Sequence, residues 1–240
     1  MRESLISIPI SEVFEPKCGC PLCRMHDTLE SRCVEYIMGA AMMEPDIRVE
    51  TNKQGFCAEH YGMLLSQRNR LSLALMLETH LREVRDTVFE KPGLFDRGAE
   101  ARQKRSERMA GSCFVCGNVG RVMDNLVDTM FGLYRKEEDF RRLFAEQEYI
   151  CLPHYRQLAA LIPVKLPKKE QSDFFDVLDG LVRRSLDALC EDVSHYCSMY
   201  DYRNSGKNAD WGNARDSIER AILFLTSKEY RKQEKTPVHK

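Results

Sequence analysis

The sequence predicts an all-α protein made of two related halves. Apolar residues recur at intervals of three and four along most of the chain, the period of a helix with one buried face. Alternation of apolar and polar residues at period two is almost absent, so no substantial sheet is expected. A pattern of cysteine and histidine also occurs twice. We therefore expect an internally duplicated helical protein in which two metal knuckles each pin helix N-termini.

Composition narrows the class of protein. The 240 residues include 36 Lys and Arg against 37 Asp and Glu, and 43% are hydrophobic. This hydrophobic content suffices for a core, and the balanced charge excludes a strongly basic nucleic-acid coat or an acidic tail protein. No apolar run reaches the ~18 residues of a membrane span. Glu3 and Ser4 interrupt the start where a signal peptide would be apolar, so we expect a cytoplasmic protein with reduced cysteines.

The repeated pattern is a C-x-x-C pair followed by a C-x-x-H pair. It occurs as Cys20–Cys23 with Cys57–His60, and again as Cys113–Cys116 with Cys151–His154. The offsets between the two copies are 93, 93, 94 and 94 residues. A nearly constant offset over four positions is the mark of an internal duplication.

Five segments follow from this pattern. They are an N-terminal segment (1–17), a first metal-binding helical repeat (18–90), a charged linker (91–112), a second metal-binding helical repeat (113–204), and a docking helix with a charged tail (205–240). The linker is expected to be a solvated loop or a short exposed helix. A phosphate-binding patch is the alternative for the linker.

In the first repeat, an apolar stripe runs from Met25 to Ala41 and predicts one helix. Apolar positions from Leu64 to Val88 predict a second, long helix after His60. The apolar run from Leu71 to Leu77 indicates that this helix is buried on more than one side.

In the second repeat, a cleaner stripe predicts a helix from Val119 to Tyr134. Pro163 is expected to end the helix that follows His154, because proline lacks a donor and clashes with the preceding turn. Ser172 is the expected N-cap of a long helix. The last helix is expected to begin near Asn213 and to dock on the body.

Cysteine and histidine at these spacings suit a tetrahedral metal ion. A C-x-x-C turn directs two thiolates at one ion, and C-x-x-H at a helix start adds one thiolate and one imidazole, which together make a closed Cys3His set suited to Zn²⁺. With one site in each repeat, we expect two zinc ions per chain. Site one would use Cys20, Cys23, Cys57 and His60, and site two would use Cys113, Cys116, Cys151 and His154. An iron–sulfur cluster, another metal, and buried inert cysteine are the alternatives.

Four cysteines lie outside the pattern. Cys33 is expected in the core, as are Cys190 and Cys197, which share one helix face. Cys18 has three open interpretations: a redox-active neighbour of site one, an alternative ligand, or a thiol without function.

No catalytic motif is present, and a closed Cys3His set leaves no position for substrate. The main hypothesis is a metal-binding scaffold or adaptor that contains zinc and binds another protein and not a membrane. A redox protein that uses Cys18, and a nucleic-acid-binding regulator, are the alternatives. Balanced charge disfavours the regulator. Oligomeric state stays open.

The motifs also resemble a known family. The segments C-G-C-P-L-C, G-F-C-x-x-H, the second C-x-x-C with C-x-x-H, and a late D-Y-R, W-G, D-S and R-A-I are similar to an uncharacterised bacterial family, found largely in Firmicutes, over about residues 16–226. The resemblance implies no established activity. Some members carry a label as ABC-transporter substrate-binding proteins, which fits poorly with a chain lacking a lipobox cysteine and an α/β pattern.

Overall fold

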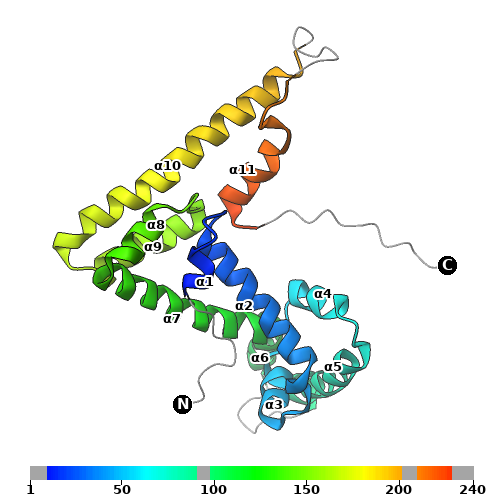
Figure 1. The fold of residues 1–240 in the computed structure, drawn as a ribbon. Coiled ribbons are helices and arrows are strands. Elements are labelled where there is room, and N and C mark those ends of the chain that lie inside the picture. The colour runs from blue at the N-terminus through cyan, green and yellow to red at the C-terminus, as the bar shows by residue number, and fades with distance from the viewer. Residues whose placement is uncertain (1–9, 91–97, 202–209, 229–240) are drawn as a thin grey trace. The chain divides into compact units, whose positions relative to one another are not determined.

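The computed structural model describes residues 10–90, 98–201 and 210–228. Within these ranges every regular element is a helix and no strand occurs, so the all-α prediction is confirmed (Figure 1). The chain divides into two compact units. The described part of unit one lies within residues 25–127, and that of unit two lies within 10–24 and 128–228.

The unit boundaries fall inside two long helices, α2 (Pro21–Met38) and α7 (Phe114–Lys136). Unit one contains most of both, together with η1 (Ala40–Met43), α3 (Pro45–Gln54), α4 (Ala58–Ser66), α5 (Arg70–Arg85), the π-helical η2 (Asp86–Glu90) and α6 (Ala99–Gly111). Unit two contains α1 (Ile10–Phe14), α8 (Glu138–Ala145), α9 (Leu152–Lys165), α10 (Lys168–Ser198), η3 (Ala214–Asp216) and α11 (Ser217–Thr226).

The core of unit one forms between α2 and the helices that follow it. Leu29, Cys33 and Ile37 of α2 are fully buried, which confirms the predicted core position of Cys33. Leu64 of α4 and Met76 of α5 are also buried. Helix α3 packs along α5 and so fixes the direction in which the chain approaches α4.

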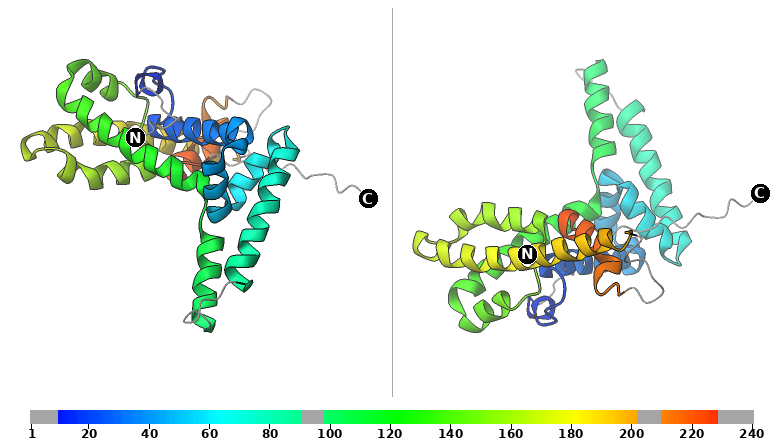
Figure 2. Two further views of the ribbon diagram at one scale, coloured as in Figure 1. Left: turned by 90° about the horizontal axis from the view of Figure 1, so that it is seen from below. Right: turned by 90° about the horizontal axis from the view of Figure 1, so that it is seen from above.

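The core of unit two is built on aromatic rings. Phe131 of α7 lies 5.2 Å from Phe174 of α10 between ring centroids, and Tyr134 lies 4.6 Å from the same ring. Phe14 and Phe144 are fully buried beside them. Helix α10 packs against both α9 and α11 (Figure 2). These contacts hold the carboxyl-terminal part of unit two together.

The predicted length of the helix after His60 is wrong. Helix α4 ends at Ser66, and α5 begins at Arg70, because the Asn69 side chain accepts a hydrogen bond from Ser72 N at 3.2 Å and caps a new helix. The prediction that this helix is buried on more than one side is also wrong, since Leu71 is 69% exposed.

Three further expectations need correction. Pro163 does not end the helix but lies inside α9, two residues before its end, where it removes one backbone hydrogen bond while Leu166 N still closes the last turn onto Ile162 O at 2.9 Å. Helix α10 begins at Lys168 with Pro167 at its N-cap, so Ser172 is an interior residue. Cys190 and Cys197 are exposed because they lie on the solvent side of α10, and not in the core.

Two further segments can be compared with their predictions. The described part of the linker is helical over α6, while residues 91–97 lie outside the described ranges. The last helical segment begins at Ala214, next to the predicted start near Asn213.

Candidate metal centres

The eight predicted ligands gather in two groups, but the predicted grouping by repeat is wrong. Centre A consists of Cys20, Cys23, Cys151 and His154, and centre B consists of Cys57, His60, Cys113 and Cys116. Each centre therefore combines the C-x-x-C pair of one half with the C-x-x-H pair of the other. Centre A lies entirely in unit two, and centre B lies entirely in unit one.

Helix length explains this crossed pairing. Helix α2, which begins at the first C-x-x-C pair, is about 27 Å long, whereas α3, the last helix before Cys57, is only about 15 Å long. In the second half, α7 covers about 35 Å and α8 only about 12 Å. In each half, the helix before the C-x-x-H pair is thus much shorter than the helix that begins at the C-x-x-C pair.

All four pairs sit at the start of a helix in the same way. The carbonyls of Cys20, Cys57, Cys113 and Cys151 each accept a hydrogen bond from the backbone N–H four residues later, at 2.8–3.2 Å. The first residue of each pair therefore flanks its helix, and the second lies one turn inside. The positive end of a helix favours a thiolate at this position.

The turn before Cys57 depends on a glycine. Gly55 ends α3 with φ +60°, and a Cβ at this residue would lie 2.5 Å from His80 Nε2. The Gly55 carbonyl accepts a hydrogen bond from Phe114 N at 3.0 Å. This bond joins the two chain segments that supply the ligands of centre B.

In centre A, the three thiols surround one nitrogen. His154 Nδ1 lies 3.0 Å from Cys151 Sγ, 3.4 Å from Cys23 Sγ and 3.6 Å from Cys20 Sγ. The sulfurs of Cys23 and Cys151 are 3.6 Å apart. Cys20 and Cys151 are buried, and the other two residues are half-buried.

Centre B repeats this arrangement. His60 Nδ1 lies 3.0 Å from Cys57 Sγ, 3.3 Å from Cys113 Sγ and 3.4 Å from Cys116 Sγ. The sulfurs of Cys57 and Cys116 are 3.9 Å apart. His60 is buried, whereas Cys116 is exposed, so centre B offers a thiol to solvent that centre A does not.

These separations fit one tetrahedral zinc ion. Bond lengths of about 2.3 Å to sulfur and 2.0–2.1 Å to nitrogen place neighbouring ligands about 3.5 Å apart for sulfur and nitrogen, and about 3.8 Å for two sulfurs. The observed distances of 3.0–3.6 Å and 3.6–3.9 Å lie around these values. The donor sets of both centres therefore fit a metal without rearrangement of the helices.

In both centres, the hydrogen-bonded environment shifts the pKa values of the candidate ligands. Burial raises the pKa of Cys113, but hydrogen bonds with His60 and with nearby backbone groups outweigh it and lower that pKa to about 6. Burial lowers the pKa of His60, whereas hydrogen bonds with Cys113 and other partners raise it to about 10. In centre A, burial likewise opposes the hydrogen bonds from Cys151, Cys23 and His154 that hold the pKa of Cys20 well below its usual range. Each centre thus stabilises a thiolate.

Centre B includes a carboxylate that the sequence analysis missed. Glu30 Oε1 lies 2.8 Å from His60 Nε2, on the side of the ring away from the thiols. No local signal points to Glu30, since thirty residues separate it from His60. Among the described residues, no carboxylate contacts Nε2 of His154 in centre A.

Cys18 lies outside both groups. It is exposed, and the guanidinium of Arg24 donates a hydrogen bond to its sulfur at 3.4 Å. The structure thus brings together all eight predicted metal ligands and leaves Cys18 beside an arginine.

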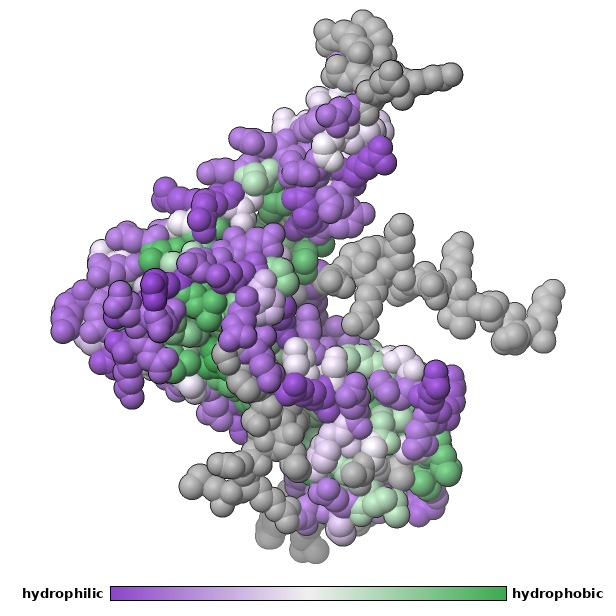
Figure 3. All heavy atoms as spheres, viewed as in Figure 1, coloured by the Kyte–Doolittle hydropathy of each residue, from purple (hydrophilic) through white to green (hydrophobic). Residues whose placement is uncertain are grey.

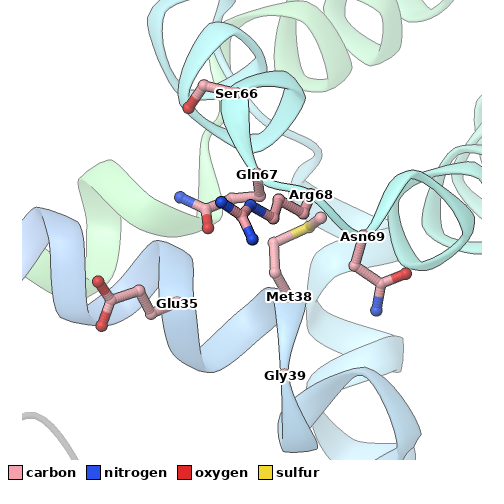
Figure 4. Close-up of a pocket in the computed structure, with 7 residues that line it drawn as sticks. All are labelled: Glu35, Met38, Gly39, Ser66, Gln67, Arg68 and Asn69. Carbon is pink, nitrogen blue, oxygen red and sulfur yellow. The ribbon is translucent and has the colours of Figure 1, made fainter.

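A separate pocket of about 470 Å³ lies in unit one between the end of α2 and the α4–α5 connection. Gln67 and Arg68 lie beside Met38 there, with Glu35 on the wall formed by α2 (Figure 4). Its lining contains no cysteine or histidine. None of the described helices is long and apolar enough to cross a membrane.

Comparison with known proteins identifies a family. The model of a family of unknown function, DUF6062, matches residues 1–232. Comparisons with curated proteins and with solved structures found no match. Because the match covers nearly the whole chain, the expected membership of an uncharacterised family is confirmed, and the chain belongs to the family of unknown function DUF6062.

Proposed function

We propose that this protein is a zinc-stabilised helical scaffold or adaptor that holds two zinc ions and binds another protein. The observation that carries the proposal is the convergence of eight side chains into two Cys3His sets with tetrahedral separations. Zinc is the metal that such sulfur-rich tetrahedral sets suit best.

The donor sets support a structural role. Four protein ligands fill the coordination shell of zinc, so neither centre keeps a position for water or substrate. Three thiolates and one neutral imidazole around Zn²⁺ carry one net negative charge. The positive N-terminal ends of two helices face each centre and offset that charge.

The crossed pairing supports a scaffold more directly. In centre A the metal would join Cys23 to His154 across 131 residues, and in centre B it would join His60 to Cys116 across 56 residues. Each ion would tie the start of a helix from one half of the chain to the start of a helix from the other. Metal binding of this kind contributes on the order of 10 kcal/mol to folding at neutral pH.

The donor geometry disfavours a polynuclear iron–sulfur cluster. The four ligand atoms of each centre lie within 4.8 Å of one another, which leaves room for a single ion. A mononuclear iron ion in the same set is the redox alternative. The balanced charge of the chain provides little attraction for phosphate, so a protein is the proposed partner rather than a nucleic acid.

Metal analysis of protein purified anaerobically tests the proposal. We expect two zinc ions per chain and no visible absorption. Removal of the metal by a strong chelator under reducing conditions should then lower the helical circular dichroism signal, because the ions hold helix starts together. Coloured protein containing iron, or a circular dichroism spectrum that does not change when the metal leaves, would refute the zinc scaffold.

A further inference from the structure

Solvent exposure distinguishes the two centres. Cys116 of centre B is exposed. In centre A, Cys20 and Cys151 are buried and the other two ligands are half-buried. Cysteine is among the residue types most often buried, and hydrophilic residues cover most of the described surface in the space-filling view (Figure 3). An exposed thiol within a donor set is therefore unusual.

A glycine keeps Cys116 open to solvent. Side chains on a helix lean toward its N-terminus, so a residue lies over the turn that precedes it on the same face. The residue four positions after Cys116 is Gly120, which is itself exposed and has no side chain to lie over the thiol. Open space surrounds the position that a Cβ at Gly120 would take. In centre A, the residue four positions after Cys23 is Asp27, and Cys23 is half-buried.

Metal binding makes this exposed thiol reactive. A thiol that binds zinc is deprotonated, and the thiolate is the form that peroxides oxidise. Three further described cysteines are exposed, but they lie outside both donor sets: Cys18, Cys190 and Cys197. With zinc in centre B, Cys116 is thus the ligand thiolate that a dissolved oxidant meets first. Its Sγ lies 3.9 Å from Cys57 Sγ, which places a second thiolate within reach.

On the basis of the zinc centres proposed above, we propose that centre B is a peroxide-sensitive modification site. Cys116 is oxidised to a sulfenic acid and then forms a disulfide with Cys57. Centre B releases its zinc ion as a result, while the covered thiols of centre A keep theirs.

Two displacements account for the atoms and electrons. The Cys116 thiolate attacks one oxygen of a hydroperoxide, the O–O bond breaks, and hydroxide or alkoxide leaves. The Cys57 thiolate then attacks the Cys116 sulfur, the S–S bond forms, and the sulfenic oxygen leaves as hydroxide. The two sulfurs lose two electrons, the peroxide gains them, and each leaving oxygen takes a proton from water. Only Cys113 and His60 then remain as ligands, so centre B no longer holds the four that zinc requires.

Hydrogen peroxide treatment of the full-length, zinc-loaded chain tests the proposal. Metal analysis before treatment tests the proposed function separately, because protein that contains no zinc would refute both. With two ions present, we expect peroxide to release one ion to a chromophoric indicator well before the other. Peptide mass spectrometry should then find Cys57 joined to Cys116. Retention of both ions, release of both at one rate, or absence of this disulfide would overturn the modification site and leave the zinc scaffold intact.

Gly120→Gln tests access to the thiol without replacing a ligand. The new side chain would lie over Cys116, so peroxide should release the ion several-fold more slowly, while zinc content and circular dichroism stay at wild-type values. Gly132→Gln is the matched control, because Gly132 lies further along the same helix and also has open space around it.

Cys190→Ser is the control for the other exposed thiols, since Cys190 is exposed but belongs to neither centre. Both control variants should release zinc at the wild-type rate. A Gly120→Gln protein that holds two ions and loses one as fast as the wild type would contradict the proposal. Slower release from Gly132→Gln or from Cys190→Ser would contradict it as well.

Discussion

The imidazole of His60 uses both of its nitrogens at centre B. Nδ1 faces the three thiols, and Nε2 lies 2.8 Å from the Glu30 carboxylate. A carboxylate in this position fixes the tautomer and orientation of a metal-binding histidine and increases its basicity. Glu30 is on α2, so this contact links α2 to a centre whose ligands come from α4 and α7 and the residues just before them.

We predict that Glu30→Gln weakens metal binding at centre B by roughly 10- to 100-fold and leaves centre A unchanged. The amide keeps the size of the side chain but loses the charge that holds His60. Competition with a chromophoric chelator should resolve one weakened ion and one tight ion per chain. Glu35→Gln, an exposed site on the same helix, is the control. Equal weakening of both ions would argue against a specific contact.

Two exposed cysteines separate the effect of solvent exposure from the effect of metal binding. Cys116 and Cys190 are both exposed, but only Cys116 belongs to a candidate metal centre. Cys116→Ser should therefore remove one of the two metal ions and lower the free energy of unfolding by several kcal/mol, while Cys190→Ser should change neither. Metal content and thermal melting measure both effects. Identical melting temperatures for the two variants would contradict the assignment of Cys116 as a ligand.

Among the elements, the starts of the four ligand-bearing helices were the most predictable feature. A C-x-x-C or C-x-x-H pair at a helix start is a local pattern, because its geometry depends only on one turn of backbone. Helix interiors were less predictable where local signals compete. Asn69 caps a new helix within an apolar run, and the run conceals that cap in the sequence.

The turn between α3 and α4 yields a prediction at this scale. Gly55→Ala should destabilise unit one by about 1–3 kcal/mol, because an alanine is strained at φ +60° and its Cβ would clash with His80. Gly62 lies inside α4 with open space around it, so Gly62→Ala should be neutral or stabilising. Urea unfolding of both variants measures the difference. Equal stability of the two would show that the turn tolerates a side chain.

At the scale of the whole molecule, the crossed pairing means that neither half of the chain holds a complete centre. Residues 1–97 contain Cys20, Cys23, Cys57 and His60, which the structure divides between centres A and B. The other half contains the remaining four ligands. The two halves thus depend on each other for both donor sets.

Separate expression of residues 1–97 and 98–240 tests this dependence. Each fragment alone should bind metal far more weakly than the full chain, and mixing the two under reducing conditions should restore two tight ions. Elemental analysis after gel filtration would measure the stoichiometry. A fragment that binds one ion as tightly as the intact protein would support pairing within each repeat instead.

The helical class, the eight candidate ligand residues and their position at helix starts followed from the sequence alone, because each depends on periodicity or on spacing within one turn. Which C-x-x-C pair shares a centre with which C-x-x-H pair did not follow from the sequence. The offset of about 93 residues equally suited pairing within a repeat, and only the folded structure, which places each C-x-x-C pair beside the C-x-x-H pair of the other half, excludes it. The Glu30–His60 contact likewise arises from packing between segments far apart in the sequence. Tertiary structure therefore decided how the ligands combine, since long-range proximity depends on how far each rigid helix carries the chain.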